Sequence, residues 1–324
     1  MPFSFTPTRR AALGALLAAA LPLSACGGGE EKPKNGLEKS EITVGVMPIT
    51  EGAAIQIAQS KGFFKAEGLT VKVRRITGAA EALPQLKGGS LDIAHAGHVG
   101  VIQAHAQGAH KLRILAEASA MTKNLTCILV PKDSNIRSPK DLAGKKIGTN
   151  ARGNQTSLLM RAALAPYQVK IDEQKDVVMA PFPNQEQLLK SEQVDAVVVP
   201  EPFVTQIQQS TGARILTDFS TGPTTDFPIT GFTSTEQFAA QNPKTVAAFQ
   251  RALVKAQNLA ADRAVLKQEI PKFTQLSPQI VDTISMNAFP TSTRAQRIQK
   301  VADVMKQFDY LKEPFDVKSI VVEN

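Results

Sequence analysis

Short runs of alternating apolar and polar residues recur along this chain, and most are followed by a stretch with helical spacing. Residues 42–62 show the pattern first. Alternation over 42–47 predicts a strand ended by a proline, and the apolar spacing over 52–62 predicts a short helix closed by glycine, with Thr50 as its N-cap. Ligands of open α/β sheets bind where strands end and helices begin, so we expect the turn at 49–51 to line a ligand site.

The same alternation continues to about residue 216, and the chain is mostly helical from 235 onward. Repeated strand–helix units predict the α/β class. The further predicted strands cover 69–73, 91–94, 112–116, 125–130, 145–149, 177–180, 194–199 and 213–216. The further predicted helices cover 79–87, 98–107, 157–164, 185–190, 243–263, 265–273, 279–287 and 295–308.

The order of these units predicts two α/β lobes. We assign 41–130 together with 233–324 to lobe 1, and 131–232 to lobe 2, with the helical tail packing back on lobe 1. The chain would then cross between the lobes twice, near 130–131 and near 228–232. Two crossovers allow hinge closure on a ligand, which predicts a ligand cleft between the lobes.

The first 25 residues have the features of an export signal rather than of a folded element. Arg9-Arg10 precede an alanine-rich apolar run that is too short for an ordinary membrane span and ends in small residues. Leu23-Ser24-Ala25-Cys26 resembles a bacterial lipobox. We therefore expect 1–25 to be a signal peptide, Cys26 to be lipidated and 26–40 to be a flexible tether. A plain secretory signal with an incidental cysteine is the alternative, and the arginine pair leaves the Sec and twin-arginine routes both open.

Composition and charge exclude several classes of protein. With 324 residues and 43% hydrophobic residues, the chain can bury one or two cores and is not disordered as a whole. The formal net charge of +8 is scattered, without a basic helix or a stacking platform, so we expect no nucleic-acid partner. Cys127, the only cysteine besides Cys26, falls in an apolar run and is expected to be an inert buried thiol.

Five stretches occur in an order and spacing typical of one family. They read GFFKAEGLTV at 62–71, GGSLDIA at 88–94, SPKDLAGKKIG at 138–148, VDA at 194–196 and EPF at 201–203. Together they resemble the bacterial solute-binding proteins of ABC transporters in the nitrate, sulfonate and taurine group, which are related to the thiamine-pyrimidine proteins. The resemblance implies an α/β, two-lobed, type II periplasmic-binding-protein fold with the ligand in the cleft. It also implies a permease and an ATPase as partners, and we expect a monomer.

Placing strand ends and helix starts on the cleft selects the turns at 49–51, 77–79, 96–98, 150–156 and 200–201 and the crossover at 226–227. Helix N-termini there would offer backbone N–H groups to an anionic head group such as sulfonate, nitrate or carboxylate. Arg152 would add a bidentate charged contact. The residues expected to bind the ligand are Thr50, Glu51, Gly78, Ala79, Gly97, His98, Arg152, Asn154, Gln155, Thr156, Glu201 and Asp226.

The charged side chains Glu51, Glu201 and Arg152 have structural alternatives. Glu51 and Glu201 would bring negative charge to an anion site, but carboxylates in the first turn of a helix also complement its dipole. If one of them faces the cleft, the ligand should carry an ammonium group as well, as taurine does. Arg152 has the alternative of a solvated loop charge. Aromatic residues near the predicted cleft are few, which favours a small aliphatic ligand over a stacked heteroaromatic one.

All four histidines fall between His95 and His110, which raises the question of a metal site. No cysteine or paired carboxylate completes a ligand set at suitable spacing, so we expect no metal and no cofactor. His98 is a candidate hydrogen-bonding group in the cleft, with a structural role as its alternative. The chain has no nucleophile elbow, no phosphate loop and no supported Cys–His pair, so we expect it not to be an enzyme.

The sequence therefore predicts an extracytoplasmic lipoprotein, anchored on the periplasmic side of the cell membrane, that binds a small anionic or zwitterionic solute for an ABC importer. A sulfonate-like or taurine-like ligand is favoured. Two alternatives remain open: a thiamine-precursor-like pyrimidine or other heteroaromatic ligand, and a role in presenting the ligand to a sensor.

Overall fold

The computed structural model describes residues 36–324 together with Met1. The expected signal peptide 1–25, the lipidation site Cys26 and the first part of the tether 26–40 therefore lie outside the described residues. Residues 36–324 belong to one compact unit, and the architecture of this unit follows.

The first sheet combines the N-terminal strands with one strand from much later in the chain. Its members are β1 (Glu41–Val46), β2 (Thr70–Arg75), β3 (Ile93–Gly97), β4 (Leu112–Ala120) and β10 (Pro228–Thr235). They lie in the order β2-β1-β3-β10-β4. β1 pairs in parallel with β2 and β3, whereas β10 runs antiparallel to both of its neighbours.

The second sheet has the same construction. Its strands are β5 (Thr126–Val130), β6 (Ile147–Thr149), β7 (Val177–Met179), β8 (Ala196–Pro200) and β9 (Arg214–Asp218), in the order β7-β6-β8-β5-β9. β6 is parallel to β7 and β8, and β5 is antiparallel to β8 and β9. Two sheets with helices between their strands make two α/β lobes, which confirms the predicted fold class.

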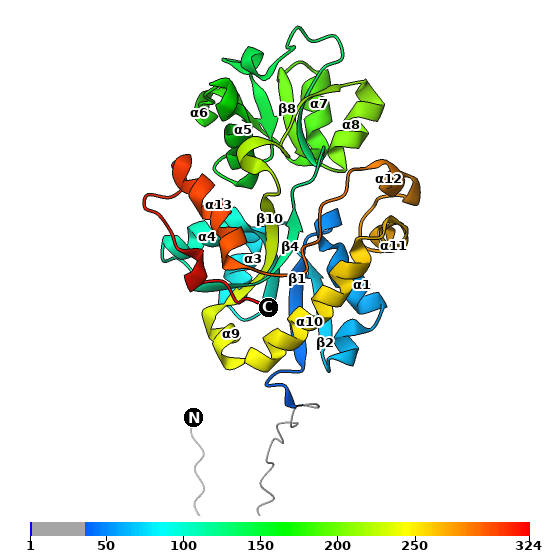
Figure 1. Ribbon diagram of the computed structural model, residues 1–324, viewed down its shortest axis with the longest axis vertical. Coiled ribbons are helices and arrows are strands. Elements are labelled where there is room, and N and C mark those ends of the chain that lie inside the picture. The colour runs from blue at the N-terminus through cyan, green and yellow to red at the C-terminus, as the bar shows by residue number, and fades with distance from the viewer. Residues whose placement is uncertain (2–35) are drawn as a thin grey trace, which may run out of the picture. The chain divides into compact units, whose positions relative to one another are not determined.

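Helices cover both faces of the first sheet (Figure 1). One face carries α1 (Ala53–Ser60) and α10 (Pro243–Ala260), and the other carries α3 (Ala79–Lys87), α4 (His98–Ala106) and α13 (Ala295–Gln307). The second sheet is packed against α5 (Gln155–Leu164), α7 (Gln185–Lys190) and α8 (Phe203–Thr211). The remaining α-helices are α2 (Phe63–Ala66), α6 (Glu173–Asp176), α9 (Glu236–Gln241), α11 (Arg263–Glu269) and α12 (Pro278–Thr283). The 3-10 turns are η2 (Thr50–Gly52), η3 (Pro139–Leu142), η4 (Ala165–Tyr167), η5 (Phe182–Asn184), η6 (Gly222–Thr224), η7 (Ile270–Lys272) and η8 (Val317–Ser319).

The helix α10 shows how the tail is held on the first lobe. Val246, Phe249, Leu253 and Ala256 recur at helical spacing, and all four are at most 3% exposed. Phe249 stacks on Phe64 with ring centroids 5.7 Å apart. Full burial of a large apolar side chain contributes about 1.5–3 kcal/mol, so this stripe fixes α10 to the N-terminal units.

The crossovers between the lobes do not lie where the sequence placed them. We assigned 41–130 to lobe 1 and 131–232 to lobe 2, but β5 pairs in the second sheet and β10 pairs in the first. The chain therefore crosses at 121–125 and at 219–227. β5 is an apolar strand buried along its whole length, and such a run fits the middle of either sheet, so its composition does not reveal which sheet it joins.

The strand β10 itself was missed and described as a crossover. Pro228 and Gly231 resemble strand breakers, and a central strand buried on both faces need not alternate. Gly231 is nevertheless required in this strand. A Cβ at that position would lie 2.5 Å from Cε1 of His98 and 2.7 Å from the carbonyl oxygen of Ala116. Close packing therefore requires Gly231, the residue that made this strand difficult to predict.

The first turn also differs in detail from the prediction. Thr50 is the first residue of η2 and not a helix N-cap; Ile49 precedes the turn, and Gly52 precedes α1. Neither η2 nor α1 has a side-chain cap. The extra 3-10 turn carries Glu51 into the protein, where it is 8% exposed.

Candidate functional site

Both crossovers join the same two sheet edges. The first runs from the end of β4 to the start of β5, and the second from the end of β9 to the start of β10. In the first sheet this is the edge at which β3 ends, since Thr230 pairs with Gly97. In the second sheet it is the edge at which β8 ends, since Thr126 pairs with Pro200. The carboxyl ends of the parallel strands thus lie at the joined edges, which is where open α/β sheets bind ligands.

The segments chosen from the sequence gather at these edges. In the first lobe they follow strand ends or precede a strand start, and in the second lobe they follow strand ends. The turns at 49–51, 77–79 and 96–98 come after β1, β2 and β3; those at 150–156 and 200–201 come after β6 and β8; and 226–227 comes before β10.

A buried polar cluster occupies the first-lobe edge. Oε2 of Glu51 accepts hydrogen bonds from the hydroxyls of Ser119, at 3.1 Å, and Thr230, at 2.8 Å. These two hydroxyl oxygens are themselves 2.7 Å apart. Three oxygens in mutual contact need three protons, and two hydroxyls supply two, so a proton on Glu51 would complete the set. The arrangement therefore fits a carboxyl group that gains a proton readily.

Burial accounts for the electrostatics of this cluster. It raises the pKa of Glu51 above its ordinary value of 4.5, against the opposing effect of the Thr230 and Ser119 hydroxyls. It also lowers the pKa of His95 to about 3, so the ring is neutral at ordinary pH. Nε2 of His95 lies 2.9 Å from the Thr230 hydroxyl, and a proton on that nitrogen would leave the hydroxyl free to donate to Glu51.

The second oxygen of Glu51 has a different environment. Oε1 makes no hydrogen bond within residues 36–324, and it is not among the fully buried unpartnered atoms of that region. It remains an acceptor whether or not Oε2 carries a proton. A buried carboxyl group therefore keeps one acceptor open at the edge that the crossovers join.

Gln155 reaches this edge from the second lobe. It opens α5, and its Oε1 accepts a long hydrogen bond of 3.5 Å from the backbone N–H of Val99. The same oxygen lies 3.2 Å from the position that a Cβ would take at Gly97. Paired residues on neighbouring strands project to one face, so the Gln155 amide approaches the face that carries the Thr230 hydroxyl. Its Nε2 is buried without a hydrogen-bond partner in the described part of the chain.

A third polar group lies on the segment that follows α12. Ala288 forms an isolated bridge with Ala120, the last residue of β4, and Thr122 donates to the carbonyl of Met286 at 2.6 Å. Asn287 between them is 4% exposed, and its Oδ1 has no partner among the described residues. The helical tail thus also brings an unpartnered acceptor to the first-lobe edge.

His98 belongs to the opposite face of β10. Its ring packs against Gly231, and successive residues of a strand point to opposite faces, so β10 separates it from the Glu51 cluster. The side chain is 1% exposed, and neither ring nitrogen makes a hydrogen bond within the described residues. Burial, assisted by the Arg297 charge, lowers the pKa of His98 to about 3, although the nearby Thr230 backbone opposes this. The position favours the structural alternative for His98.

Glu201 is also buried, but both of its oxygens are occupied. Oε1 accepts from the Thr205 hydroxyl at 2.8 Å and from the backbone N–H of Ser285 at 3.0 Å, and Oε2 accepts from the backbone N–H of Thr205 at 3.0 Å. Burial raises its pKa, and these donors oppose the effect. Glu201 therefore accepts from the first turn of α8 and holds the tail segment that runs past the second lobe.

Arg152 and Asn154 are engaged within the second lobe. The Arg152 guanidinium donates to the backbone carbonyl of Val177 at 2.7 Å and to Gln174 at 3.5 Å. Oδ1 of Asn154 accepts from the backbone N–H of Ser157 at 3.0 Å, which makes Asn154 the N-cap of α5. The two side chains therefore build the turn that presents Gln155, rather than adding the charged clamp expected of Arg152.

Asp226 is paired with a cation of the first lobe. It forms an ion pair with Arg297 of α13, which also contacts Glu117 with Nε to oxygen distances of 2.9 and 3.0 Å. The Arg297 hydrogen bonds lower the pKa of Asp226, whereas burial raises that of Glu117 to about 7. Asp226 thereby anchors the second crossover to lobe 1.

The other predicted residues take supporting positions. Thr50 is 2% exposed, beside Glu51, and Gly97 leaves the space that Gln155 enters. Gly78 and Ala79 are half-buried at the start of α3, and Thr156 is half-buried in the first turn of α5.

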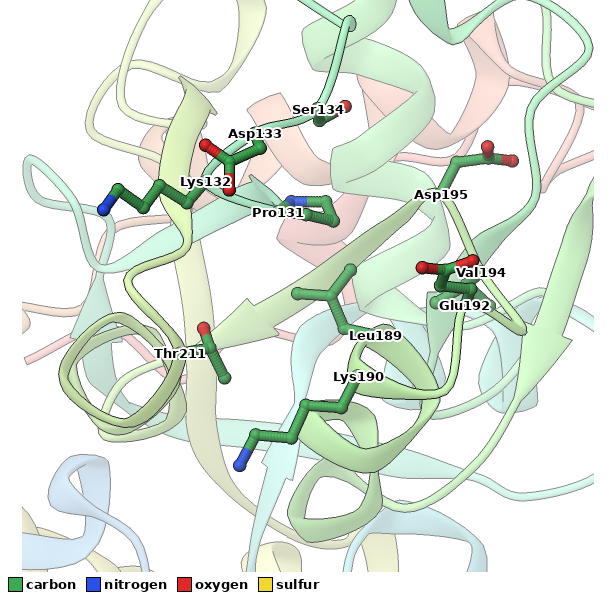
Figure 2. A pocket seen from close by; sticks show the side chains of 10 residues that line it. All are labelled: Pro131, Lys132, Asp133, Ser134, Leu189, Lys190, Glu192, Val194, Asp195 and Thr211. Atoms are coloured by element: carbon green, nitrogen blue, oxygen red, sulfur yellow. The ribbon is translucent and has the colours of Figure 1, made fainter.

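A surface groove lies elsewhere on the second lobe. It measures about 610 Å³ and is bounded by Pro131, just past β5, and by Val194 and Asp195, just before β8 (Figure 2). Because β5 and β8 are antiparallel, these residues mark the edge of the second sheet that is remote from the crossovers. Oppositely charged side chains line it, including Lys132, Asp133, Lys190, Glu192 and Asp195. It is therefore separate from the candidate site.

The described residues offer no cluster of three His, Cys, Asp or Glu side chains suited to a metal ion. Cys127 is buried, and burial raises its pKa far above the ordinary value, so it is a poor nucleophile. Within residues 36–324, helices are too short or too polar to cross a membrane.

Sequence reasoning missed Ser119, Thr230 and Asn287. Ser119 and Thr230 lie within strands, where a small polar residue gives no sign of the face it occupies. Asn287 lies in a tail that was interpreted as helix. Only the pairing of β10 between β3 and β4 brings Ser119 and Thr230 beside Glu51. If β10 had been recognised as a strand, Ser119 and Thr230 could have been placed at the site.

Comparisons with known proteins agree with this architecture. The model of the NMT1-like family matches residues 35–273. YtlA of Bacillus subtilis, a provisionally named binding protein, is 25% identical over 240 residues, which cover 71% of this chain and 70% of YtlA. The nitrate/nitrite binding protein NrtA of a Nostoc species is 27% identical over 255 residues, which cover 73% of this chain and 57% of NrtA.

A solved structure shows the same fold. The periplasmic aliphatic sulphonate binding protein SsuA of Escherichia coli superposes with a TM-score of 0.72 at 17% identity, covering 87% of this chain and 97% of SsuA. The fold is therefore that of the periplasmic binding proteins.

Proposed function

The chain belongs to the NMT1-like family, and from that premise we propose that it is an extracytoplasmic solute-binding protein of an ABC importer. It captures a small anionic or zwitterionic organic solute, sulfonate-like or taurine-like, between its two lobes and delivers it to a permease driven by an ATPase. The names of NrtA and SsuA support this class of ligand.

One observation carries the proposal. The Gln155 amide of the second lobe is directed at the edge of the first lobe where Glu51 keeps an open oxygen, and its buried Nε2 lacks a partner in the described chain. Buried donors are seldom left without partners in folded proteins, because each costs about 1–3 kcal/mol. A bound ligand that accepts this hydrogen bond would remove the cost and hold the lobes together.

Isothermal titration of the purified protein with taurine, alkanesulfonates, nitrate and pyrimidines tests the proposal. We expect binding of at least one small sulfonate or zwitterion, weakened about tenfold or more by Gln155→Ala, which corresponds to about 1.4 kcal/mol. Gln107→Ala, an exposed residue at the end of α4, is the matched control and should bind normally. If only the heteroaromatic compounds bound, the result would favour the pyrimidine alternative. Chemical alteration of a probe by the protein would contradict a binding role.

The membrane attachment is part of the same proposal. Lipidation of Cys26 after removal of 1–25 would hold the protein at the outer face of the cell membrane. Radiolabelled palmitate should label the full chain and not a Cys26→Ser variant, which should be released to the soluble fraction. Equal labelling of both forms would contradict the anchor.

A gene for a sensor kinase beside the gene of this protein, in place of genes for a permease and an ATPase, would favour the sensing alternative. Loss of solute uptake after deletion of the protein, with uptake restored by re-expression, would support transport instead.

A further inference from the structure

The carboxyl group of Glu51 has no cationic partner among the described residues. Among the described residues, the Ser119 and Thr230 hydroxyls are the groups that donate to this carboxyl, and Glu51 forms no ion pair there. The two arginines described above have other partners, since Arg297 pairs with Glu117 and Asp226, and Arg152 donates to Val177. The two buried histidines of this edge are neutral.

A buried carboxyl without a cationic partner is costly, and an opposite charge placed beside it removes much of that cost. The hydroxyls of Ser119 and Thr230 satisfy Oε2 alone. Oε1 accepts hydrogen bonds in either protonation state, so whatever occupies the space next to it must be a donor. A protonated amine supplies both the donor and the charge.

Glu201 has no oxygen that lacks a hydrogen-bond partner. Three donors from Thr205 and Ser285 bond to its two oxygens, so neither oxygen is left without a partner. Both oxygens of Asp226 bond to Arg297, so among Glu51, Glu201 and Asp226 only Glu51 keeps an oxygen without a partner in the described chain.

We propose that Glu51 selects a ligand that carries a protonated amine, so that the solute is zwitterionic or cationic and simple anions such as nitrate are bound weakly. This inference rests on the proposed function, because it concerns the ligand of the same site. It narrows the class of solute and assigns Glu51 as the residue that determines specificity.

Matched pairs of probes that exchange an amine for a hydroxyl test this directly. Taurine and 2-hydroxyethanesulfonate form one pair, and the 5-aminomethyl and 5-hydroxymethyl forms of 4-amino-2-methylpyrimidine form the other. Titration at about pH 8 should show the amine of at least one pair binding about tenfold or more tighter than its alcohol. In Glu51→Gln, which keeps an acceptor for Ser119 and Thr230, this ratio should fall towards one. Glu313→Gln, an exposed residue without a hydrogen bond or ion pair in the described chain, is the control and should keep the ratio.

The outcomes separate the inference from the proposed function. Binding of an alcohol or of nitrate as tightly as the amines would overturn the inference while leaving solute binding intact. An amine preference that survives in Glu51→Gln, with the fold verified by circular dichroism and thermal unfolding, would also overturn it. No binding of the four probes, of nitrate or of any alkanesulfonate would contradict the proposed function itself.

Discussion

The carboxylate of Glu201 accepts a hydrogen bond from the backbone N–H of Ser285 at 3.0 Å, and the two residues belong to different lobes. Glu201 follows β8 of the second sheet, whereas Ser285 lies in the tail that packs on the first. The two residues are 84 positions apart in the sequence, and the hydrogen bond between them is part-buried. It ties the tail to the second lobe beside the candidate site without occupying that site.

This contact predicts that Glu201 contributes to stability. Glu201→Ala would leave the N–H groups of Ser285 and Thr205 without their acceptor, and each buried unsatisfied donor costs about 1–3 kcal/mol. We expect the free energy of unfolding in urea to fall by about 2–4 kcal/mol. The exposed control Glu313→Ala should change it by less than about 0.5 kcal/mol. An unchanged midpoint for Glu201→Ala would show that the contact contributes nothing.

The buried histidines predict a dependence of stability on pH. The pKa of His98 is about 3 in the folded protein, and its ordinary value is 6.5. Between these two pH values the His98 ring gains a proton in the unfolded chain but stays neutral in the folded protein, which favours unfolding. The contribution of neutral His98 to the stability of the fold is therefore complete above pH 6.5 and is lost as the pH falls towards 3. Each pH unit in this window should cost about 1.4 kcal/mol.

Comparing variants isolates this effect from the titration of the carboxyl groups. Between pH 7.5 and 4.5, the difference in unfolding free energy between wild type and His98→Gln should change by about 3 kcal/mol, in favour of the variant at low pH. His110→Gln, at a half-buried position between α4 and β4, serves as the control substitution. A difference that stays constant across this range would mean that His98 titrates normally in the folded protein.

The close packing at Gly231 predicts a cost for any side chain there. Gly231→Ala would place a Cβ against the His98 ring and the Ala116 carbonyl, so β10 or the ring must move. We expect a loss of about 1–3 kcal/mol in urea unfolding, as in other overpacked interiors. Gly88→Ala is the comparison, because its φ of −79° suits alanine and its nearest neighbour, the Pro84 carbonyl, is 3.3 Å away. Equal effects of the two substitutions would contradict the packing argument.

Local patterns in the sequence predict most of the fold. The α/β class, the strand ends that carry the turns and the helical tail all follow from periodicity over a few residues. The stripe on α10 is an example, since Val246, Phe249 and Leu253 repeat at helical spacing.

Features that depend on pairing between distant segments were not predictable in this way. β10 joins strands more than a hundred residues earlier in the chain, and its Gly231 is explained by His98 and not by its own neighbours in sequence. The cluster of Glu51, Ser119 and Thr230 depends on that pairing. The periodicity around Glu201 likewise cannot show that the distant Ser285 N–H donates to its carboxylate.

The position of a bound ligand tests the central claim most directly. A crystal structure of the full chain with whichever matched amine titrates most tightly should show the ligand between the lobes, its amine within hydrogen-bond distance of Oε1 of Glu51 and an acceptor facing Nε2 of Gln155. Ligand density in the remote groove beside Pro131 and Val194, with nothing between Glu51 and Gln155, would contradict the account.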